Sequence, residues 1–259
     1  MMMSPLLSIK EISHVYFTKE SIFHALQDVS FSVKEGEFVS ILGPSGCGKT
    51  TLLSIISGLV TPTQGTVLIN ESEVCSKHSS IGYMLQQDYL FPWKTIKQNV
   101  LLGLNILHDK RKESINNALN LLNEMGLSKV EDAYPRQLSG GMRQRAALAR
   151  TLATNPSVLL LDEPFSALDY QTKLKLENLV VKTLKEYDKT AILVTHDIEE
   201  SIAMSDRIIL LSKQPGRIAK NFTVPQELKT LTPFQARRHP LFPSLFHSIW
   251  KELEALESV

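Results

Sequence analysis

The sequence has few cysteines and almost no net charge, and each shortage excludes a class of protein. Cys47 and Cys75 are its 2 cysteines, too few for a disulfide framework or a cysteine-rich metal site. Its 28 basic and 27 acidic residues leave a formal charge of +1, which gives no electrostatic footprint for nucleic acid or an anionic membrane. We therefore expect a protein of a reducing compartment that does not bind nucleic acid.

The sequence also lacks a long uninterrupted hydrophobic run. Residues 50–70 carry no charge, but Pro62 and Gly65 interrupt them, and the apolar part covers only residues 52–60. A membrane-spanning helix needs about 20 such residues. The N-terminus has no basic segment followed by an apolar core, so no signal peptide is expected. We expect a soluble chain whose membrane role, if it has one, requires a separate membrane partner.

One glycine-rich stretch follows the phosphate-binding pattern G-x-x-x-x-G-K-[ST]. Its residues are Gly43, Pro44, Ser45, Gly46, Cys47, Gly48, Lys49 and Thr50. It lies between a buried-strand run over residues 38–42 and a helix-like run over residues 51–57. In that context successive backbone N–H groups converge on phosphate oxygens, and the helix dipole adds positive potential. We expect Lys49 to reach the β- and γ-phosphates and Thr50 to offer its hydroxyl to Mg²⁺.

The hydrophobic pattern predicts strands before and after a largely helical interval in the middle of the chain. Residues 6–42 are predicted as strands with an antiparallel arrangement, and further strands are expected over residues 66–69, 81–85, 158–161, 191–195 and 207–211. The continuous apolar runs at 158–161 and 191–194 are typical of parallel strands covered on both faces. Between residues 88 and 155, apolar residues recur at helical spacing. We interpret this interval as a helical lobe inserted between core strands.

Two further helices are predicted nearer the C-terminus. The helix after Asp169 is expected to bury a face made of Leu174, Leu179, Val180 and Leu184. After a proline-punctuated stretch, a last helix has an apolar face that consists of Leu245, Phe246, Ile249, Leu253 and Leu256. Packing of this face on the main domain is one interpretation, and contact with a partner or a second copy is the other.

Two more motifs carry a family resemblance. Residues 138–145, Leu-Ser-Gly-Gly-Met-Arg-Gln-Arg, resemble the signature motif of ABC-type ATPases, and residues 159–163, Leu-Leu-Leu-Asp-Glu, resemble their Walker B strand. Together with the glycine-rich loop, their order resembles that family from residue 6 to about residue 224. The resemblance implies an α/β P-loop NTPase core, with a mixed, mainly parallel sheet, antiparallel N-terminal strands and a helical subdomain over about 88–155. The ATPase domain would cover 1–224, and 225–259 would form a short C-terminal extension.

The carboxylates at the end of the Walker B strand are the candidate catalytic groups. Asp162 is expected to hold the Mg²⁺ shell and Glu163 to act as general base for water, although both residues also suit a turn before Pro164. The resemblance adds Gln86, which would sense Mg²⁺ and water, and His196, the switch histidine that contacts the γ-phosphate. The implied metal ligands are Thr50, Gln86 and Asp162.

The rest of the implied ATP site comes from several segments. Ser139, Gly140 and Gly141 lie at a predicted helix start, where free N–H groups favour phosphate. The resemblance implies that they serve ATP bound to a second subunit, so that the working unit is a dimer, by expectation a homodimer. It also places Tyr16 under adenine, with Phe17 as the rival, Thr51 after the loop, and Asp169 in the D-loop between subunits.

The sequence departs from the family pattern at two places. Met142 stands where many members carry glutamine, which removes a polar side chain from the signature motif but leaves its backbone N–H groups. At residues 86–88, Gln-Gln-Asp replaces the frequent Gln-Glu-Pro, so the contact with a membrane subunit is expected to differ in detail.

Residues 162–169 and 90–93 look most like importer subunits of the nitrate, sulfonate and taurine type. The implied function is hydrolysis of ATP, with Mg²⁺, to power a transmembrane permease from the cytoplasmic face of the cell (inner) membrane. An extracytoplasmic solute-binding protein would be an indirect partner. The alternatives are a soluble ABC ATPase not coupled to transport, an importer of another small molecule such as a thiamine precursor, and a pure nucleotide-binding scaffold.

Overall fold

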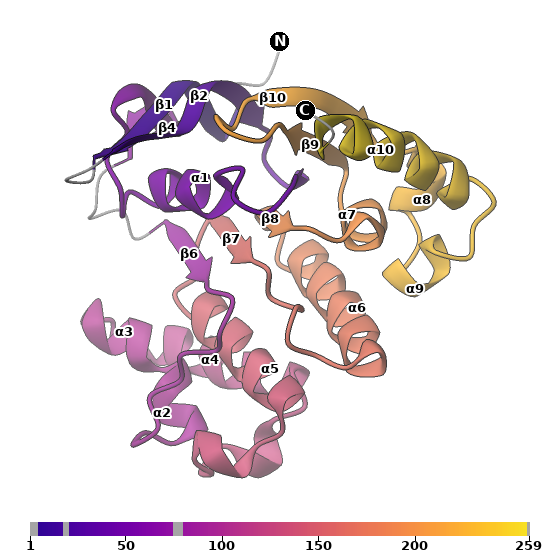
Figure 1. Cartoon of the computed structure of the whole chain (residues 1–259). Coiled ribbons are helices and arrows are strands. Elements are labelled where there is room, and N and C mark those ends of the chain that lie inside the picture. Colours follow the sequence, from indigo (N-terminus) through magenta and orange to yellow (C-terminus); the bar gives the residue numbers. More distant parts are fainter. Residues whose placement is uncertain (1–4, 18–20, 75–79, 258–259) are drawn as a thin grey trace. The chain divides into compact units, whose positions relative to one another are not determined.

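The structure is a computed structural model that describes residues 5–17, 21–74 and 80–257. The chain folds into two compact units. The first unit comprises residues 1–78 and 181–259, and the second comprises residues 79–180 (Figure 1). No helix among the described residues is both long enough and apolar enough to cross a membrane.

An antiparallel sheet opens the first unit. Its strands, in the order β2, β1, β4 and β5, are Ile22–Val33, Leu7–Phe17, Gln64–Ile69 and Ser72–Glu73. Leu7 pairs with Val33 on one side and with Ile69 on the other, and all three side chains are buried. The expected antiparallel strands are therefore present, but they form a sheet of their own with β4. Alternating apolar residues in this segment fit a sheet with one covered face.

Short strands form the core of the first unit. In the order β10, β9, β3 and β8 they are Ile218–Thr223, Arg207–Leu211, Phe38–Leu42 and Thr190–Thr195. β3 pairs in parallel with both β8 and β9, and every residue of β3 and β8 is buried. This agrees with their mostly apolar sequences. Helix α1 (Lys49–Ile56) lies between β8 and the antiparallel sheet (Figure 1).

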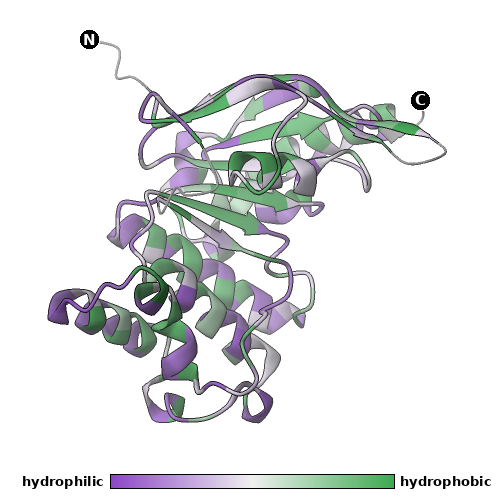
Figure 2. Ribbon diagram, turned by 90° about the vertical axis from the view of Figure 1, so that its left-hand side faces the viewer, coloured by the Kyte–Doolittle hydropathy of each residue, from purple (hydrophilic) through white to green (hydrophobic). Residues whose placement is uncertain are grey.

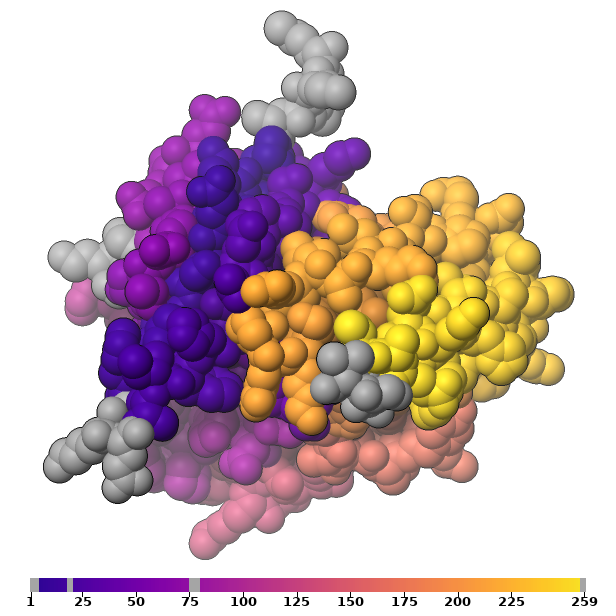
Figure 3. Space-filling model, turned by 45° about the horizontal axis from the view of Figure 1, so that its top comes forward, coloured from indigo at the N-terminus to yellow at the C-terminus, as the bar shows by residue number. Residues whose placement is uncertain are grey.

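The C-terminal extension packs on helix α7 (Ile198–Met204) of the same unit. It consists of α8 (Gln226–Lys229), α9 (Pro233–Ala236) and α10 (Phe242–Glu257), and the space-filling view shows its yellow residues against the orange ones of the core (Figure 3). Arg237 Nε donates to Glu199 Oε2 at 3.4 Å. Ile249 is fully buried, whereas Phe246 is half-buried and stacks on the exposed Trp250. Only part of the predicted apolar face is therefore covered.

The second unit is mostly helical. Its parallel strands are β6 (Ile81–Met84) and β7 (Val158–Asp162), and its helices are α2 (Ile96–Val100), α3 (Leu102–Ile106), α4 (Lys112–Glu124), α5 (Gly140–Leu152) and the first part of α6 (Tyr170–Glu186). Helices α2 to α5 fall inside the interval 88–155, as the sequence predicts, although this unit also contains two strands. Hydrophobic residues follow the strands and inner helix faces, shown in green in Figure 2.

The buried face of α6 differs from the prediction. Leu176, Val180 and Leu184 are at most 4% exposed, whereas Leu174 and Leu179 are half-buried. The expected set combined residues that do not share one helical stripe. A spacing of four residues keeps side chains on one face, and 176, 180 and 184 have that spacing. The prediction that Leu174 and Leu179 form the buried face was therefore wrong.

Candidate functional site

The glycine-rich loop connects β3 to α1 in the first unit. Gly46 and Gly48 have φ angles of 79° and 92°, a left-handed region that glycine adopts readily. A Cβ on Gly48 would come 2.8 Å from the carbonyl oxygen of Ala25, and one on Gly43 would come 2.8 Å from that of Leu211. The backbone thus has room for glycine alone at these positions. The loop ends at the N-terminus of α1, whose first N–H groups have no partner within the helix.

Lys49 is turned into the loop. Its side chain is 6% exposed, and its Nζ donates to the carbonyl oxygens of Gly43 at 2.7 Å and Pro44 at 3.0 Å. The sulfur of Cys47 lies 3.8 Å from the same nitrogen, and burial raises the pKa of that thiol. A buried ammonium group beside the backbone N–H groups of this loop is suited to bind a phosphate oxygen.

Tyr16 is linked to the start of α1 by a side-chain hydrogen bond. Its hydroxyl lies 3.3 Å from the Oγ1 of Thr51, and its ring meets the edge of His14 with centroids 4.5 Å apart. Tyr16 is 40% exposed, so part of this side chain is accessible to a ligand. Phe17 is 73% exposed and is the next residue of β1. The link to Thr51 favours Tyr16 over Phe17 as the aromatic ring beside the loop.

His196 follows β8 at the same edge of the sheet as the loop. Leu42 and Thr195 are register partners in the parallel pair β3–β8, so Gly43 and His196 leave the sheet side by side. Asp197 caps α7, accepting from the backbone N–H groups of Glu199 and Glu200 at 2.7 and 3.2 Å. His196 is exposed, and it lies between the last residue of β8 and the cap of α7, which both fix the backbone of this turn.

In the second unit, Gln86 and Glu163 are brought together. Met84 and Leu161 are register partners in β6 and β7, which places both following segments at one edge. The Nε2 of Gln86 donates to Glu163 Oε2 at 3.4 Å and to Ser166 Oγ at 3.3 Å. Glu163 has a φ angle of 45°, a strained backbone for a residue with a side chain. Such strain is common where a side chain has to be aimed at a reacting group.

The oxygen atoms near Gln86 suit a hard cation. The side-chain nitrogen of Gln86 is used by two acceptors, so its side-chain oxygen Oε1 is the atom of this amide suited to a cation. Tyr83 donates to Asp162 Oδ2 at 3.3 Å. Over residues 5–17, 21–74 and 80–257, no group of three His, Cys, Asp or Glu is placed to hold a metal. Mg²⁺ often takes only one or two protein ligands besides water and substrate phosphates. Of the expected metal ligands, Gln86 and Asp162 belong to the second unit and Thr50 belongs to the first.

The signature motif begins helix α5. Ser139 is the N-cap, with its Oγ accepting from the backbone N–H of Met142 at 3.4 Å. Gly141 packs so closely on α6 that an added Cβ would come 2.4 Å from Cγ2 of Thr172. Both residues line a cavity of about 510 Å³, together with Arg145 and Lys175. The Met142 side chain is half-buried and its backbone N–H is used by the cap.

Asp169, the residue before α6, caps that helix. Its Oδ1 accepts from the backbone N–H of Thr172 at 3.1 Å, and the bonds from Thr172 lower the pKa of this carboxyl. Gly140 is half-buried at the start of α5. The second unit thus holds Gln86, Ser139, Gly140, Gly141, Asp162, Glu163 and Asp169, and the first unit holds Tyr16, the glycine-rich loop, Thr51 and His196.

Several side chains whose contacts the sequence did not predict hold the segment that contains Gln86 in place. Arg143 Nε donates to Asp88 Oδ2 at 2.9 Å, and Gln144 Nε2 donates to the carbonyl oxygen of Gln86 at 3.2 Å. Arg150 donates to the carbonyl oxygens of Asp88 and Tyr89, both at 2.7 Å. These side chains all come from α5. The available signal was the basic and amide residues inside the signature motif and on the helix that continues from it.

Comparisons with known proteins agree with the geometry. The sequence profile of the ABC transporter family matches residues 26–166. An uncharacterized ABC transporter ATP-binding protein of Bacillus subtilis is 62% identical over 97% of this chain and 96% of the relative. A taurine import ATP-binding protein of Jannaschia is 44% identical over 78% and 75%, and a nitrate import ATP-binding protein of Synechocystis is 38% identical over 91% and 90%.

Solved structures confirm the predicted fold. A dimeric ATP-binding cassette in a post-hydrolysis state, bound to ADP and Pi, superposes with a TM-score of 0.74 and 36% identity. The match covers 85% of this chain and 99% of the other. The predicted P-loop NTPase fold with antiparallel N-terminal strands and a helical insertion is therefore correct.

Proposed function

Since the chain belongs to the ABC transporter family and is an ATPase of the importer type, we propose that a dimer of it powers a permease for a small solute of the nitrate, sulfonate or taurine class. The observation that carries the proposal is the position of Gln86. Its amide touches Glu163, and it begins an exposed aromatic segment suited to a membrane subunit. One stretch of chain thus connects the catalytic carboxylate to an outer surface.

ATP binding is assigned to the first unit and its loop. The backbone N–H groups of residues 43–50 would hold the phosphates, and Lys49 would neutralise the β- and γ-phosphates. Tyr16 would stack on adenine, which gives affinity but little discrimination between bases. Mg²⁺ would be held by Thr50, Asp162 and Gln86, and its role is to neutralise charge on the phosphates.

Hydrolysis is assigned to three side chains. Glu163 would take the proton of the attacking water, Gln86 would orient Glu163 and the water, and His196 would hold the γ-phosphate. The strained φ of Glu163 and the hydrogen bond from Gln86 support this assignment, because both fix the carboxylate before substrate arrives. Ser139 and Gly141 would bind the ATP of the second subunit through their backbone N–H groups, with Asp169 near the junction.

The permease surface is assigned to the segment after β6. Leu85, Tyr89 and Trp93 are 40, 58 and 69% exposed, and Phe91 lies edge-on to Trp93 with ring centroids 5.3 Å apart. A cluster of exposed aromatic and apolar side chains of this kind is typical of a protein-binding surface.

Buried polar groups hold this aromatic segment in place. Asn99 is fully buried; its Oδ1 accepts from the N–H of Phe91 at 2.7 Å, and its Nδ2 donates to the carbonyl oxygen of Lys94 at 3.1 Å. Arg150 fixes the carbonyl oxygens of Asp88 and Tyr89. A surface that is already ordered loses less conformational entropy on binding, which favours a docking role over a flexible loop.

The test is whether a membrane permease co-purifies with this chain. Tyr89→Ala with Trp93→Ala should lower the amount of co-purified permease by about tenfold or more, because truncation of interface aromatics commonly costs 2 kcal/mol. ATP binding by the isolated chain should not change. Trp250→Ala is the matched control, since Trp250 is an exposed tryptophan on α10. An intact protein found wholly away from membranes, even with its neighbours co-expressed, would favour the soluble ATPase instead.

A further inference from the structure

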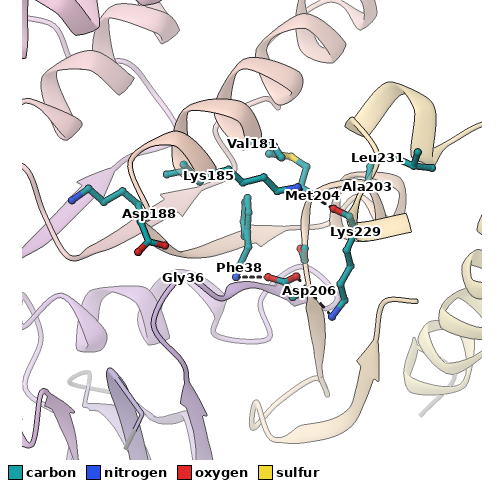
Figure 4. Close-up of a pocket in the computed structure, with 13 residues that line it drawn as sticks. Gly36, Phe38, Val181, Lys185, Asp188, Ala203, Met204, Asp206, Lys229 and Leu231 are labelled. Atoms are coloured by element: carbon teal, nitrogen blue, oxygen red, sulfur yellow. Dashed lines mark hydrogen bonds and ion pairs between the residues drawn. The ribbon is translucent and has the colours of Figure 1, made fainter. Parts of the chain in front are cut away.

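A second cavity lies in the first unit, where the core meets the C-terminal extension. It has a volume of about 160 Å³ and is lined by the start of β3 and by the ends of α6, α7 and α8 with the residues that follow them. Figure 4 shows Phe38, Lys185, Asp206 and Lys229 around it, each from a different segment. We call it the lysine cavity, because Lys185, Lys189 and Lys229 all line it.

The floor of the lysine cavity is apolar. Phe38, Val181, Leu184, Ala203 and Met204 line it, and each is at most 7% exposed. An engineered cavity of about 150 Å³ with walls of this kind holds a benzene molecule. The lysine cavity therefore has room for a body of about six non-hydrogen atoms.

The rim of the lysine cavity has an excess of one positive charge. Its three lysines face two carboxylates, Asp188 and Asp206. Asp206 is already engaged, since its Oδ2 accepts from the backbone N–H of Phe38 at 2.8 Å. A ligand that balances this rim carries one negative charge.

Two of the lysines keep donors available. Lys185 Nζ uses one donor on the carbonyl oxygen of Lys229, at 2.9 Å. Lys229 Nζ lies 3.8 Å from Asp206 Oδ1, which is longer than a hydrogen bond. Each ammonium has three N–H donors, so both can bind an oxyanion without breaking these contacts. Lys189 is half-buried, and burial lowers its pKa, which reflects a poorly hydrated charge on the same rim.

From this combination, we propose that the lysine cavity binds a short-chain organic monoanion. The carboxylate or sulfonate group would bind at the rim, where Lys185 and Lys229 offer N–H donors, and the aliphatic chain would cover Phe38 and Met204. Charge-assisted hydrogen bonds from the lysines to the anionic group supply the specificity. Burial of the ligand's aliphatic part supplies the rest of the affinity. This site is separate from the nucleotide loop.

The position of the lysine cavity gives such a ligand a route to the ATPase residues. Phe38 begins β3, which leads to Gly43, and Met204 ends α7, which begins two residues after His196. Lys229 belongs to the C-terminal extension. A bound anion would therefore join the extension to the two elements that carry the loop and the switch histidine.

The test uses the full chain and four probes of similar size. Butyrate and 1-propanesulfonate are the expected ligands, with 1-butanol and butylammonium as neutral and cationic counterparts, all at constant ionic strength set with chloride. The two anions should give saturable binding by calorimetry. At a hundredfold excess over Kd, each anion should raise the Tm by about 5–10 °C. Hydrogen exchange should slow in residues 198–206 and 226–231.

Variants assign the binding to the cavity. Lys185→Gln with Lys229→Gln should weaken both anions about tenfold or more, because two charge-assisted contacts are lost. Lys182→Gln is the matched control, as Lys182 lies on α6 and pairs with Glu186 instead. An unchanged Tm in the absence of ligand verifies that each variant folds.

Three results would overturn the proposal. These are butanol binding as tightly as butyrate, wild-type affinity in the double lysine variant, and no saturable binding of either anion. If butyrate and 1-propanesulfonate have different Kd values, the anion with the lower Kd shows whether the site prefers a carboxylate or a sulfonate. Because the readouts are binding and hydrogen exchange of the chain alone, they do not depend on the permease proposal.

Discussion

Arg143 of the signature helix and Asp88 of the segment after Gln86 form an ion pair, with Nε and Oδ2 2.9 Å apart. Arg143 also donates from Nη1 to the carbonyl oxygen of Leu138 at 2.9 Å. Asp88 is one of the positions where the sequence departs from the usual family pattern. Asp88 therefore has a structural role at this position, because its carboxylate holds Arg143 next to Ser139.

The Asp88–Arg143 pair should be weakly but measurably coupled. The two side chains are 25 and 37% exposed, so solvent screens the attraction, and a double-mutant cycle with Asp88→Ala and Arg143→Ala should give about 0.5–1 kcal/mol. Urea unfolding at low and high salt measures this energy, which should fall with salt. The Lys182–Glu186 pair on α6, 70 and 51% exposed, is the control and should give less. Coupling no larger than in the control would contradict the prediction.

Gly141→Ala should disturb the signature helix through one contact, the methyl Cγ2 of Thr172. Because that carbon is only 2.4 Å from the added Cβ, the two helices must separate, and overpacking of this kind commonly costs about 1–3 kcal/mol. Thr172→Ser removes the methyl group, so the double variant should recover most of the lost stability. Chemical denaturation of the single and double variants provides the comparison. Absence of any rescue would show that another constraint acts at Gly141.

His14 should make the folded state less stable in mild acid. Its ring is 8% exposed, neither nitrogen has a hydrogen-bond partner among the described residues, and burial lowers its pKa. The unfolded chain then binds more protons than the folded one below about pH 6.5, so stability is complete above that pH and is lost as the pH falls through it.

His14→Leu removes this titration. Between about pH 7.5 and 5.5 the variant should lose less unfolding free energy than the wild type, by at most about 1.4 kcal/mol per pH unit. Urea midpoints at several pH values measure the difference. His24→Leu, at an exposed position of β2, is the control and should keep the wild-type pH dependence. Parallel curves for wild type and His14→Leu would refute the assignment.

Glu163→Gln should abolish turnover without abolishing ATP binding. Loss of a general base lowers the rate by about 10²–10⁴-fold, while the carboxamide oxygen can still accept from Gln86. The variant should accumulate as an ATP-bound dimer, visible by size-exclusion chromatography. Lys49→Ala should differ from Glu163→Gln in ATP binding, because it should lose most of the affinity for the triphosphate. Ordinary turnover by Glu163→Gln would remove this residue from its proposed role.

Cys47 should react slowly with alkylating reagents. In a Cys75→Ser variant it is the remaining thiol; it is fully buried, and burial raises its pKa. Labelling by N-ethylmaleimide should therefore be far slower than in the unfolded chain, and it should keep accelerating above about pH 8.5, where an ordinary thiol is already half ionised. ATP should slow it further. Equal rates with and without ATP would argue against nucleotide binding at the loop.

The sequence predicted the fold well wherever the signal was local. Continuous apolar runs identified β7 and β8, and the glycine pattern located the turn between β3 and α1. Solved cassettes confirm the resulting fold. The catalytic roles of Glu163 and His196 rest on their motifs and stay predictions, although the structure places both residues at the ends of the expected strands.

Contacts between distant polar residues could not be predicted. The hydrogen bond from Tyr83 to Asp162 joins residues 79 positions apart, and those from Arg150 span about 60 positions. Nothing near a tyrosine or an arginine in the sequence says which distant carbonyl or carboxylate it will meet. Such partners depend on tertiary packing, not on local periodicity. The buried face of α6 was misjudged for a different reason, because the expected residues did not follow one helical stripe.

The bonds from Arg150 and the cap at Ser139 have a mechanical consequence. They sit near opposite ends of α5, a helix of 13 residues, or about 20 Å. A helix resists bending and compression far better than a loop does. If Tyr89 is displaced, α5 should therefore move as a rigid body. Ser139 would then be displaced in the same direction and by a similar distance.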